Sequence, residues 1–197
     1  TLKEFKIADN GPIAELYKLN NKKNEINIDD LSYLIGPIIN AGGRLGKSNL
    51  ATQLLSADNN KAINQKSLEL IGLNNKRREI ESITLKDIDF HKLEKDNKEI
   101  IIYYNPNINE GLIGIIASRL KDYFNKPSIV ITNSNNILKG SARSIYNYNI
   151  GRVIKNLLDK DIIISGGGHN MAAGFTLKKD NLNDFKNFIL EDYKKNM

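Results

Sequence analysis

The hydrophobic pattern of the chain changes near residue 95, and this change limits the folds that are open to it. Residues 59–89 carry an imperfect apolar stripe at helical spacing, with many charges and no proline, which predicts one long helix. Beyond residue 95, short β-rich runs alternate with helical patterns, which predicts an α/β domain over residues 95–197. We expect strands at residues 99–104, 127–132, 137–144, 161–165 and 171–178, and helices at residues 111–124, 151–158 and 180–195.

Two segments, residues 1–58 and 59–94, precede this domain. The second holds the long helix and a linker, and Gly72 weakens that helix by about 1 kcal/mol relative to alanine. A long charged helix between two patterned regions indicates a connector. An ordinary surface helix of the same domain fits the pattern equally well.

The first segment mixes short helical patterns with polar loops. Asp29 or Asp30 is expected to cap a short helix, and Gly36-Pro37 to end it. Ser48 is expected to cap the helix that follows.

Composition narrows the class of protein only loosely. The net charge of +6 and the pI near 9.3 permit an anionic partner such as nucleic acid, although a compositional drift toward lysine, asparagine and isoleucine also explains them. The chain has no cysteine, so disulfides and thiolate metal sites are excluded and a cytoplasmic location is the default. No signal peptide opens the chain and no run is long and apolar enough for a membrane helix, so no membrane partner is expected.

The stretch SGGGH is the first candidate site. Gly166, Gly167 and Gly168 follow the strand expected at residues 161–165, and consecutive glycines there could aim several N–H groups at a phosphate. His169 could donate a hydrogen bond to a phosphate oxygen or a leaving group. A tight turn with a surface histidine is the structural alternative.

The stretch KGSARS (139–144) is the second candidate. In an extended strand Ser141 and Arg143 share one face, and together with Ser144 and nearby Lys139 they would suit a bound anion. A solvated edge strand is the alternative.

The stretch INAGGRLGKS (39–48) is the third candidate. Its glycines make it flexible, and Arg44 and Lys47 add positive charge. It matches neither of the glycine-rich nucleotide-binding patterns GxGxxG and GxxxxGK[ST], so a nucleotide-cofactor site lacks support. A helix–helix linker is the alternative to an anion site.

A hydrolytic centre is missing from these patterns. His91 and His169 are far apart in sequence, no DxD, HxH or HExxH spacing occurs, and no serine lies in a GxSxG elbow. The chain therefore offers groups that could hold phosphate, and no metal ligands are predicted.

Four patterns in order resemble the RecJ family of single-strand-specific 5′→3′ exonucleases, in the DHH phosphoesterase superfamily. The matching stretches are INAGGRL, GLIGIIASRL, KGSARS and GGGHNMAAGFTL, which extend over roughly residues 35–190. Each is a weak signal alone, and the ordered set is specific. They are similar to the carboxy-terminal half of the RecJ catalytic core.

The resemblance implies a fold and a division of labour. It implies that residues 1–58 are the end of a helical DHH domain, that residues 59–94 are the long connector helix and linker, and that residues 95–197 form a mixed-sheet DHHA1-type domain. In such enzymes the DHH domain binds two Mn²⁺ or Mg²⁺ ions that activate water. The DNA lies between the domains. No metal is expected in this chain, single-stranded DNA is the expected partner, and no oligomeric state is predicted.

The resemblance also implies residue roles. The glycines 166–168 and His169 would contact the scissile phosphate or its neighbour, with His169 as the catalytic residue of this part. Ser141, Arg143 and Ser144 would hold other phosphates of the strand. Arg44 would reach the DNA from the loop before the connector.

The chain departs from the family pattern in two respects. The DHH motif and the other metal-ligand motifs are absent and the chain starts at Thr1, so we expect an inactive piece of a longer enzyme. Ile108 and Asn109 precede Glu110 where the family usually has an aromatic residue and a histidine, which puts the contact of that histidine in doubt. Two other interpretations stay open: a different DHH/DHHA1 phosphodiesterase, acting on oligoribonucleotides or cyclic dinucleotides, and a non-catalytic nucleic-acid-binding module.

Overall fold

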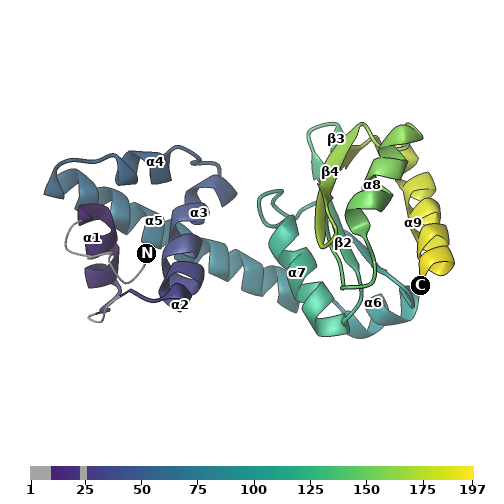
Figure 1. Cartoon of the computed structure of the whole chain (residues 1–197), viewed down its shortest axis with the longest axis horizontal. Helices are drawn as coiled ribbons and strands as arrows, with labels where there is room; N and C mark the ends of the chain where they lie inside the picture. The colour runs from purple at the N-terminus through teal and green to yellow at the C-terminus, as the bar shows by residue number, and fades with distance from the viewer. Residues whose placement is uncertain (1–9, 23–25) are drawn as a thin grey trace. The chain divides into compact units, whose positions relative to one another are not determined.

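The computed structural model describes residues 10–22 and 26–197. The chain divides into two compact units, Thr1–Ile80 and Glu81–Met197 (Figure 1). The predicted long helix is α5 (Asn60–Lys86), and it contributes residues to both units. Within the described ranges, no helix combines the length and the apolar character that crossing a membrane requires.

The first unit is helical. Its elements are α1 (Gly11–Leu19), α2 (Ile28–Asp30), the π-helical turn η2 (Leu31–Ile35), α3 (Gly36–Arg44), α4 (Leu50–Leu55) and most of α5. Leu16, Ile38, Leu54 and Leu70 are buried in its core, so the apolar side of α5 packs against the short helices of this unit.

The prediction that Gly36-Pro37 ends a helix is wrong. The Gly36 N–H donates to the carbonyl of Leu31, five residues back, and α3 continues without a break. Proline has no N–H and its ring crowds the carbonyl four residues back in a regular α-helix. The wider π-turn places that carbonyl elsewhere, so Pro37 fits at the start of α3.

The helix caps of this unit also differ from the expected ones. Asn27 caps α2 by accepting from the N–H of Asp30, and the Asp30 carboxylate accepts in return from the Asn27 N–H, which is a capping box. Asn49 and not Ser48 precedes α4. Asparagine has the same short acceptor as aspartate and serine, so the sequence pattern did not separate these neighbours.

The second unit is a three-layer α/β sandwich. It comprises α6 (Phe90–Asp96), β1 (Ile101–Tyr104), α7 (Ile113–Phe124), β2 (Ser128–Ser134), β3 (Ile137–Arg143), α8 (Ile150–Asp159), β4 (Ser165–His169), β5 (Ala172–Leu177), the 3₁₀ turn η3 (Lys179–Asn181) and α9 (Leu182–Asn196). The strand order is β1-β2-β3-β5-β4, with β1 and β2 parallel and the other pairs antiparallel. The predicted mixed α/β fold is confirmed.

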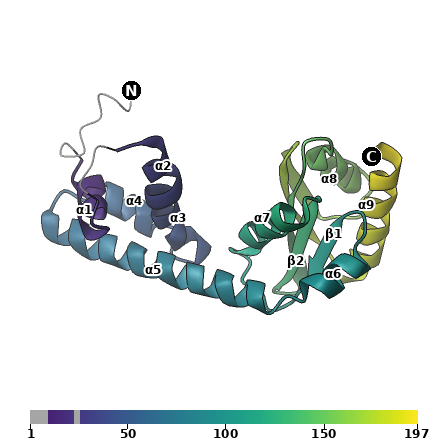
Figure 2. The same ribbon diagram turned by 90° about the horizontal axis from the view of Figure 1, so that it is seen from below.

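Helices cover both faces of this sheet. Helix α7 packs on one face, while α8 and α9 pack on the other (Figure 2). Alternation along each strand divides the residues between the two layers: Ile101 and Val130 face α7, whereas Ile129 and Ile131 face α8 and α9. Strand β4 forms one edge of the sheet.

The strand predicted at residues 161–165 lies later in the chain. Asp161 adopts a left-handed φ of 56° after α8, and the strand begins only at Ser165, so the three glycines lie inside β4 and do not follow it. A Cβ on Gly166 would lie 2.8 Å from Cγ2 of Ile154, and one on Gly168 would lie 2.2 Å from the carbonyl oxygen of Ala172. The absent side chains let β4 pack this closely against α8 and β5.

Candidate functional site

Strand register places Arg143 and His169 in one row across the sheet. Arg143 on β3 pairs with Ala172 on β5, which pairs in turn with His169 on β4. Neighbouring strands are about 4.8 Å apart, so about 10 Å separates the two outer backbones. Because residues at opposite positions share a face, the predicted stretches KGSARS and GGGH come together in this Arg143–His169 row.

Bare backbone lies beside the row on the same face. Gly167 and Gly174 are paired with each other and exposed. A Cβ on Gly167 would meet nothing within 4 Å, and one on Gly174 would meet only the carbonyl oxygen of Gly140, at 3.9 Å. We call Gly167 and Gly174 the glycine floor. It lets the backbone of a ligand approach the sheet closely.

The Arg143 guanidinium lies between its own strand and α7. Its Nη1 donates to Oγ of Ser141 at 3.1 Å and to the carbonyl oxygen of Ala142 at 2.8 Å. A Cβ on Gly114, in the first turn of α7, would lie 3.0 Å from Nη2 of Arg143 and 3.2 Å from Ser141 Oγ. No side chain caps this helix start, so its partial positive charge adds to that of the guanidinium.

His169 stands at the turn between β4 and β5. Its Nδ1 accepts from the N–H of Met171 at 3.3 Å, so in the neutral ring Nε2 carries the proton and is the donor. The first turn of α8 supports this turn from behind: a Cβ on Gly151 would lie 2.9 Å from the His169 carbonyl oxygen. The exposed imidazole therefore offers one hydrogen-bond donor from a backbone that is held in place.

Ser144 does not share the face of the row. It is only 1% exposed, its Oγ donates to the carbonyl oxygen of Tyr148 at 2.6 Å, and its N–H donates to the carbonyl oxygen of Met171 at 2.9 Å. Alternation turns its side chain to the side of Ala142, toward α8 and α9. Its contacts tie the end of β3 to the β4–β5 turn.

Arg44 belongs to the first unit. It is the last residue of α3, so the stretch 39–48, whose glycines were expected to make it flexible, is largely helix and tight turn. The Lys47 N–H donates to the carbonyl oxygen of Gly42 at 2.7 Å, and Gly46 takes a φ of +81°. Gly42 has to be a glycine here because a Cβ would lie 2.6 Å from the Lys47 carbonyl oxygen.

A second charged group lies further along β3. Lys139 donates from Nζ to Oε2 of Glu110 at 2.9 Å, and Ser134 Oγ donates to the same oxygen at 2.6 Å. The hydrogen bond from Ser134 and then that from Lys139 hold the pKa of the Glu110 carboxyl below its usual value. Lys139 therefore has a carboxylate partner.

The arrangement suits the binding of a phosphodiester. It combines a guanidinium, an imidazole donor, a serine hydroxyl and an open backbone surface. Across residues 10–22 and 26–197, no group of three or more histidine, cysteine, aspartate or glutamate residues could hold a metal ion. No role was predicted for Gly114 or Gly174. Gly114 matters because α7 comes close to Arg143, and Gly174 because β5 pairs with β3, and neither approach can be seen in the sequence.

The DHHA1 domain model matches residues 97–195, which is half of the chain. Among curated relatives, the single-stranded-DNA-specific exonuclease RecJ of Haemophilus influenzae is 34% identical over 187 residues, covering 91% of this chain and 32% of that protein. RecJ of Bacillus subtilis is 32% identical over 183 residues, covering 91% of this chain and 23% of that protein. The chain thus spans a third or less of the length of these relatives.

Solved structures agree on the fold. RecJ from Thermus thermophilus, in complex with Mn²⁺, superposes with a TM-score of 0.82 at 24% identity, covering 94% of this chain and 27% of that one. An exonuclease RecJ bound to manganese superposes with a TM-score of 0.78 at 23% identity, covering 95% of this chain and 46% of that one. By its matching domain model, and in line with its resemblance to RecJ, the chain belongs to the DHHA1 domain family.

Proposed function

We propose that this chain supplies the DNA-binding part of a RecJ-type 5′→3′ exonuclease, which hydrolyses phosphodiester bonds of single-stranded DNA in the cytoplasm. The observation that carries the proposal is the Arg143–His169 row beside the glycine floor, in a unit of the DHHA1 family. A chain of phosphates laid along this face would meet cationic and neutral donors and, over the glycine floor, bare backbone.

Each group has a distinct role in this proposal. Arg143 and Ser141 bind one phosphate through the guanidinium and the hydroxyl. His169 donates from Nε2 to an oxygen of the scissile phosphate or of its neighbour. Gly167 leaves the backbone of β4 open to the DNA strand, whereas Gly166 and Gly168 let β4 pack against α8 and β5. Arg44 contributes positive charge from the first unit.

Residues 1–58, 59–94 and 95–197 correspond in this proposal to the end of a DHH domain, the connector and the DHHA1 domain. Two divalent ions, Mn²⁺ or Mg²⁺, bound by the DHH domain of the whole enzyme would supply the activated water. Relatives solved with Mn²⁺ or Mg²⁺ support this view. The residues of this chain bind and orient the strand.

Binding of a labelled, 5′-phosphorylated single-stranded oligonucleotide tests the proposal. Arg143→Ala and His169→Ala should each raise the Kd several-fold at moderate salt, because each removes a donor to phosphate. Lys155→Ala is the matched control, since it removes an exposed positive charge from α8, which covers the opposite face of the sheet. Equal binding by all four proteins would mean that affinity comes from diffuse positive charge, and the row would not be a site.

A further inference from the structure

Tyr146 presents an aromatic ring to solvent close to the candidate site. Its side chain is 92% exposed, the highest value among the large apolar and aromatic residues in the described part of the chain. It follows Arg143, the end of β3, by three residues. A lone exposed tyrosine needs no special explanation, and what distinguishes Tyr146 is the way its loop is held.

The loop is fastened to the turn that carries His169. The Ser144 N–H donates to the carbonyl oxygen of Met171 at 2.9 Å on one side, and the Ile150 N–H donates to the carbonyl oxygen of Asn170 at 3.2 Å on the other. The loop that holds Tyr146 and the turn that holds His169 are therefore one hydrogen-bonded structure.

Tyr146 occupies the apex of a tight turn within this loop. The Tyr148 N–H donates to the carbonyl oxygen of Ile145 at 3.2 Å, which leaves Tyr146 and Asn147 as the two central residues. Ile145 packs on the core and Tyr148 is 1% exposed, so the residues that flank the apex are anchored inside the unit.

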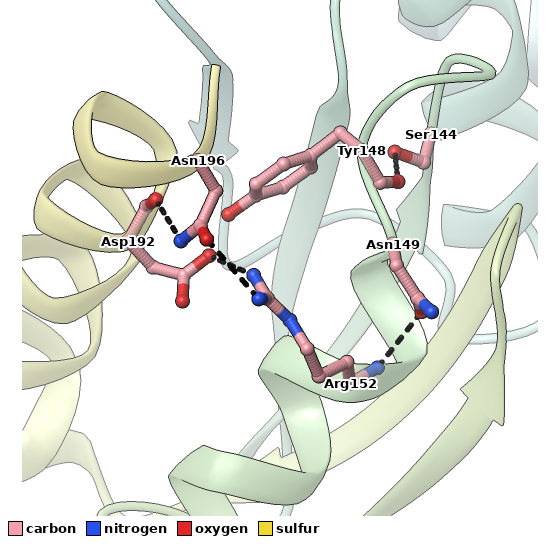
Figure 3. A network of polar contacts seen from close by, with 6 residues as sticks. All are labelled: Ser144, Tyr148, Asn149, Arg152, Asp192 and Asn196. Atoms are coloured by element: carbon pink, nitrogen blue, oxygen red, sulfur yellow. Dashed lines mark hydrogen bonds and ion pairs between the residues drawn. The ribbon is translucent and has the colours of Figure 1, made fainter.

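Polar contacts fix the exit of the loop (Figure 3). Ser144 Oγ donates to the carbonyl oxygen of Tyr148 at 2.6 Å, and the Asn149 side chain accepts from the Arg152 N–H at 3.0 Å and so caps α8. Arg152 pairs with Asp192 of α9 at 2.8 Å. A ring displayed on so constrained a turn loses little conformational freedom when a ligand stacks on it.

We infer that Tyr146 is a stacking platform for an unpaired base of the strand whose phosphates lie on the Arg143–His169 row. This inference rests on the proposed function. A single strand that is held by its phosphates leaves its bases free, and each base presents a π face to which an aromatic ring can stack regardless of sequence. The tyrosine ring supplies that surface from the loop that follows Arg143 and is hydrogen-bonded to the His169 turn, and its hydroxyl remains in water.

Binding of two oligonucleotides to the whole 197-residue chain tests the inference. One strand is oligo-dT and the other has the same length and 5′-phosphate but abasic sites, so it keeps the phosphates and lacks the bases. Tyr146→Ala should raise the Kd for oligo-dT about 10-fold and leave that for the abasic strand unchanged. Tyr146→Phe should bind like the unaltered chain, and Tyr146→Leu like Tyr146→Ala.

Tyr123→Ala is the control for loss of an exposed tyrosine. Tyr123 lies nine residues beyond Gly114 on α7, about 13 Å along the helix axis, so its removal should leave both Kd values unchanged. Because Tyr123 contacts Phe90, thermal melting checks that this variant is folded at the assay temperature.

The outcomes separate this inference from the proposed function. If Arg143→Ala weakens binding of both strands and Tyr146→Ala weakens neither, the stacking inference fails and the phosphate row stands. An equal loss for both strands in Tyr146→Ala also overturns stacking, since the residue would then act on the backbone. A loss in Tyr146→Ala alone, restricted to oligo-dT, overturns the row and the inference that rests on it, and leaves Tyr146 as a base contact for a strand held elsewhere. If the unaltered chain binds neither strand, both ideas fail.

Discussion

Gly114 lies directly against the guanidinium group of Arg143. A Cβ at position 114 would be 3.0 Å from Nη2, closer than ordinary van der Waals contact. The first turn of α7 thus confines the arginine from above, while Ser141 and the backbone of β3 hold it from below. The position of the guanidinium depends on a residue that has no side chain.

Gly114→Ala should therefore weaken binding without weakening the fold. The arginine tip is flexible and moves aside, so the free energy of unfolding should change by less than about 1 kcal/mol. The displaced guanidinium should raise the Kd for a single-stranded oligonucleotide several-fold. Gly72→Ala in α5 is the control: a Cβ there meets nothing within 4 Å, so it should stabilise the helix and leave binding unchanged.

Alanine at Gly168 should weaken the fold, whereas alanine at the neighbouring Gly167 should weaken oligonucleotide binding. Gly168→Ala places a Cβ 2.2 Å from the Ala172 carbonyl oxygen, on backbone that cannot turn away, and should lower the free energy of unfolding by about 2 kcal/mol. Gly167→Ala meets no neighbour and should unfold like the unaltered chain. Its methyl group stands on the glycine floor, so oligonucleotide binding should weaken. Urea denaturation and binding titrations compare the two variants, and the reverse pattern would show that the register of β4 is wrong.

The salt dependence of binding should test the proposed phosphate contact of Arg143. Each phosphate that a cation neutralises on a single strand contributes a slope of about −0.7 to the plot of log K against log salt. Arg143→Ala should reduce the slope by about this amount, whereas Tyr146→Ala should leave it unchanged because stacking releases no counterions. Titrations at four salt concentrations measure it, and an unaltered slope in Arg143→Ala contradicts a direct phosphate contact.

Glu110 should make part of the stability of the fold depend on pH. Because the folded state holds its pKa below the usual 4.5, the Glu110 contribution is fully present above that pH and is lost as the pH falls through the lower folded value. Glu110→Gln should make the unfolding free energy fall less steeply as the pH is lowered. Ser134→Ala should reduce the same fall in part, because it removes the hydrogen bond that lowers the Glu110 pKa most. Unfolding free energies between about pH 6 and pH 3 measure the effect. Glu79→Gln is the control: it removes an equal charge from the surface of α5 and should leave the pH dependence of the unfolding free energy unchanged.

The 197-residue chain alone should not hydrolyse DNA. Its described residues contain no group of metal ligands, and the row holds donors but no base or nucleophile that is activated by a neighbour. Incubation of the purified chain with labelled single-stranded DNA and Mn²⁺ should release no nucleotide. Release that His169→Ala abolishes would contradict the proposed division of roles between this chain and a metal-binding DHH domain.

The order of elements could be predicted because its signals are local. The Pro-free charged stretch became α5, and the alternating β-rich and helical runs became the layers of the second unit. The spacing of apolar residues, with a period of 2 in strands and 3.6 in helices, can be read directly from the sequence. The four family motifs are also local signals, and they pointed to Ser141, Arg143 and His169 without any knowledge of strand pairing.

Tertiary structure decided which of these residues lie together. Pairing of β3 with β5, the second strand of the β4–β5 hairpin, set Arg143 and His169 in one row and turned Ser144 into the core. Close packing explains why β4 can be a strand of glycines, and the approach of α7 explains why Gly114 matters. A sequence pattern indicates which residues could hold a phosphate. Strand register and packing distances determine which side of the sheet they face. Alternation shows only that neighbouring side chains lie on opposite faces, and the paired strand and the covering helix decide which face is which.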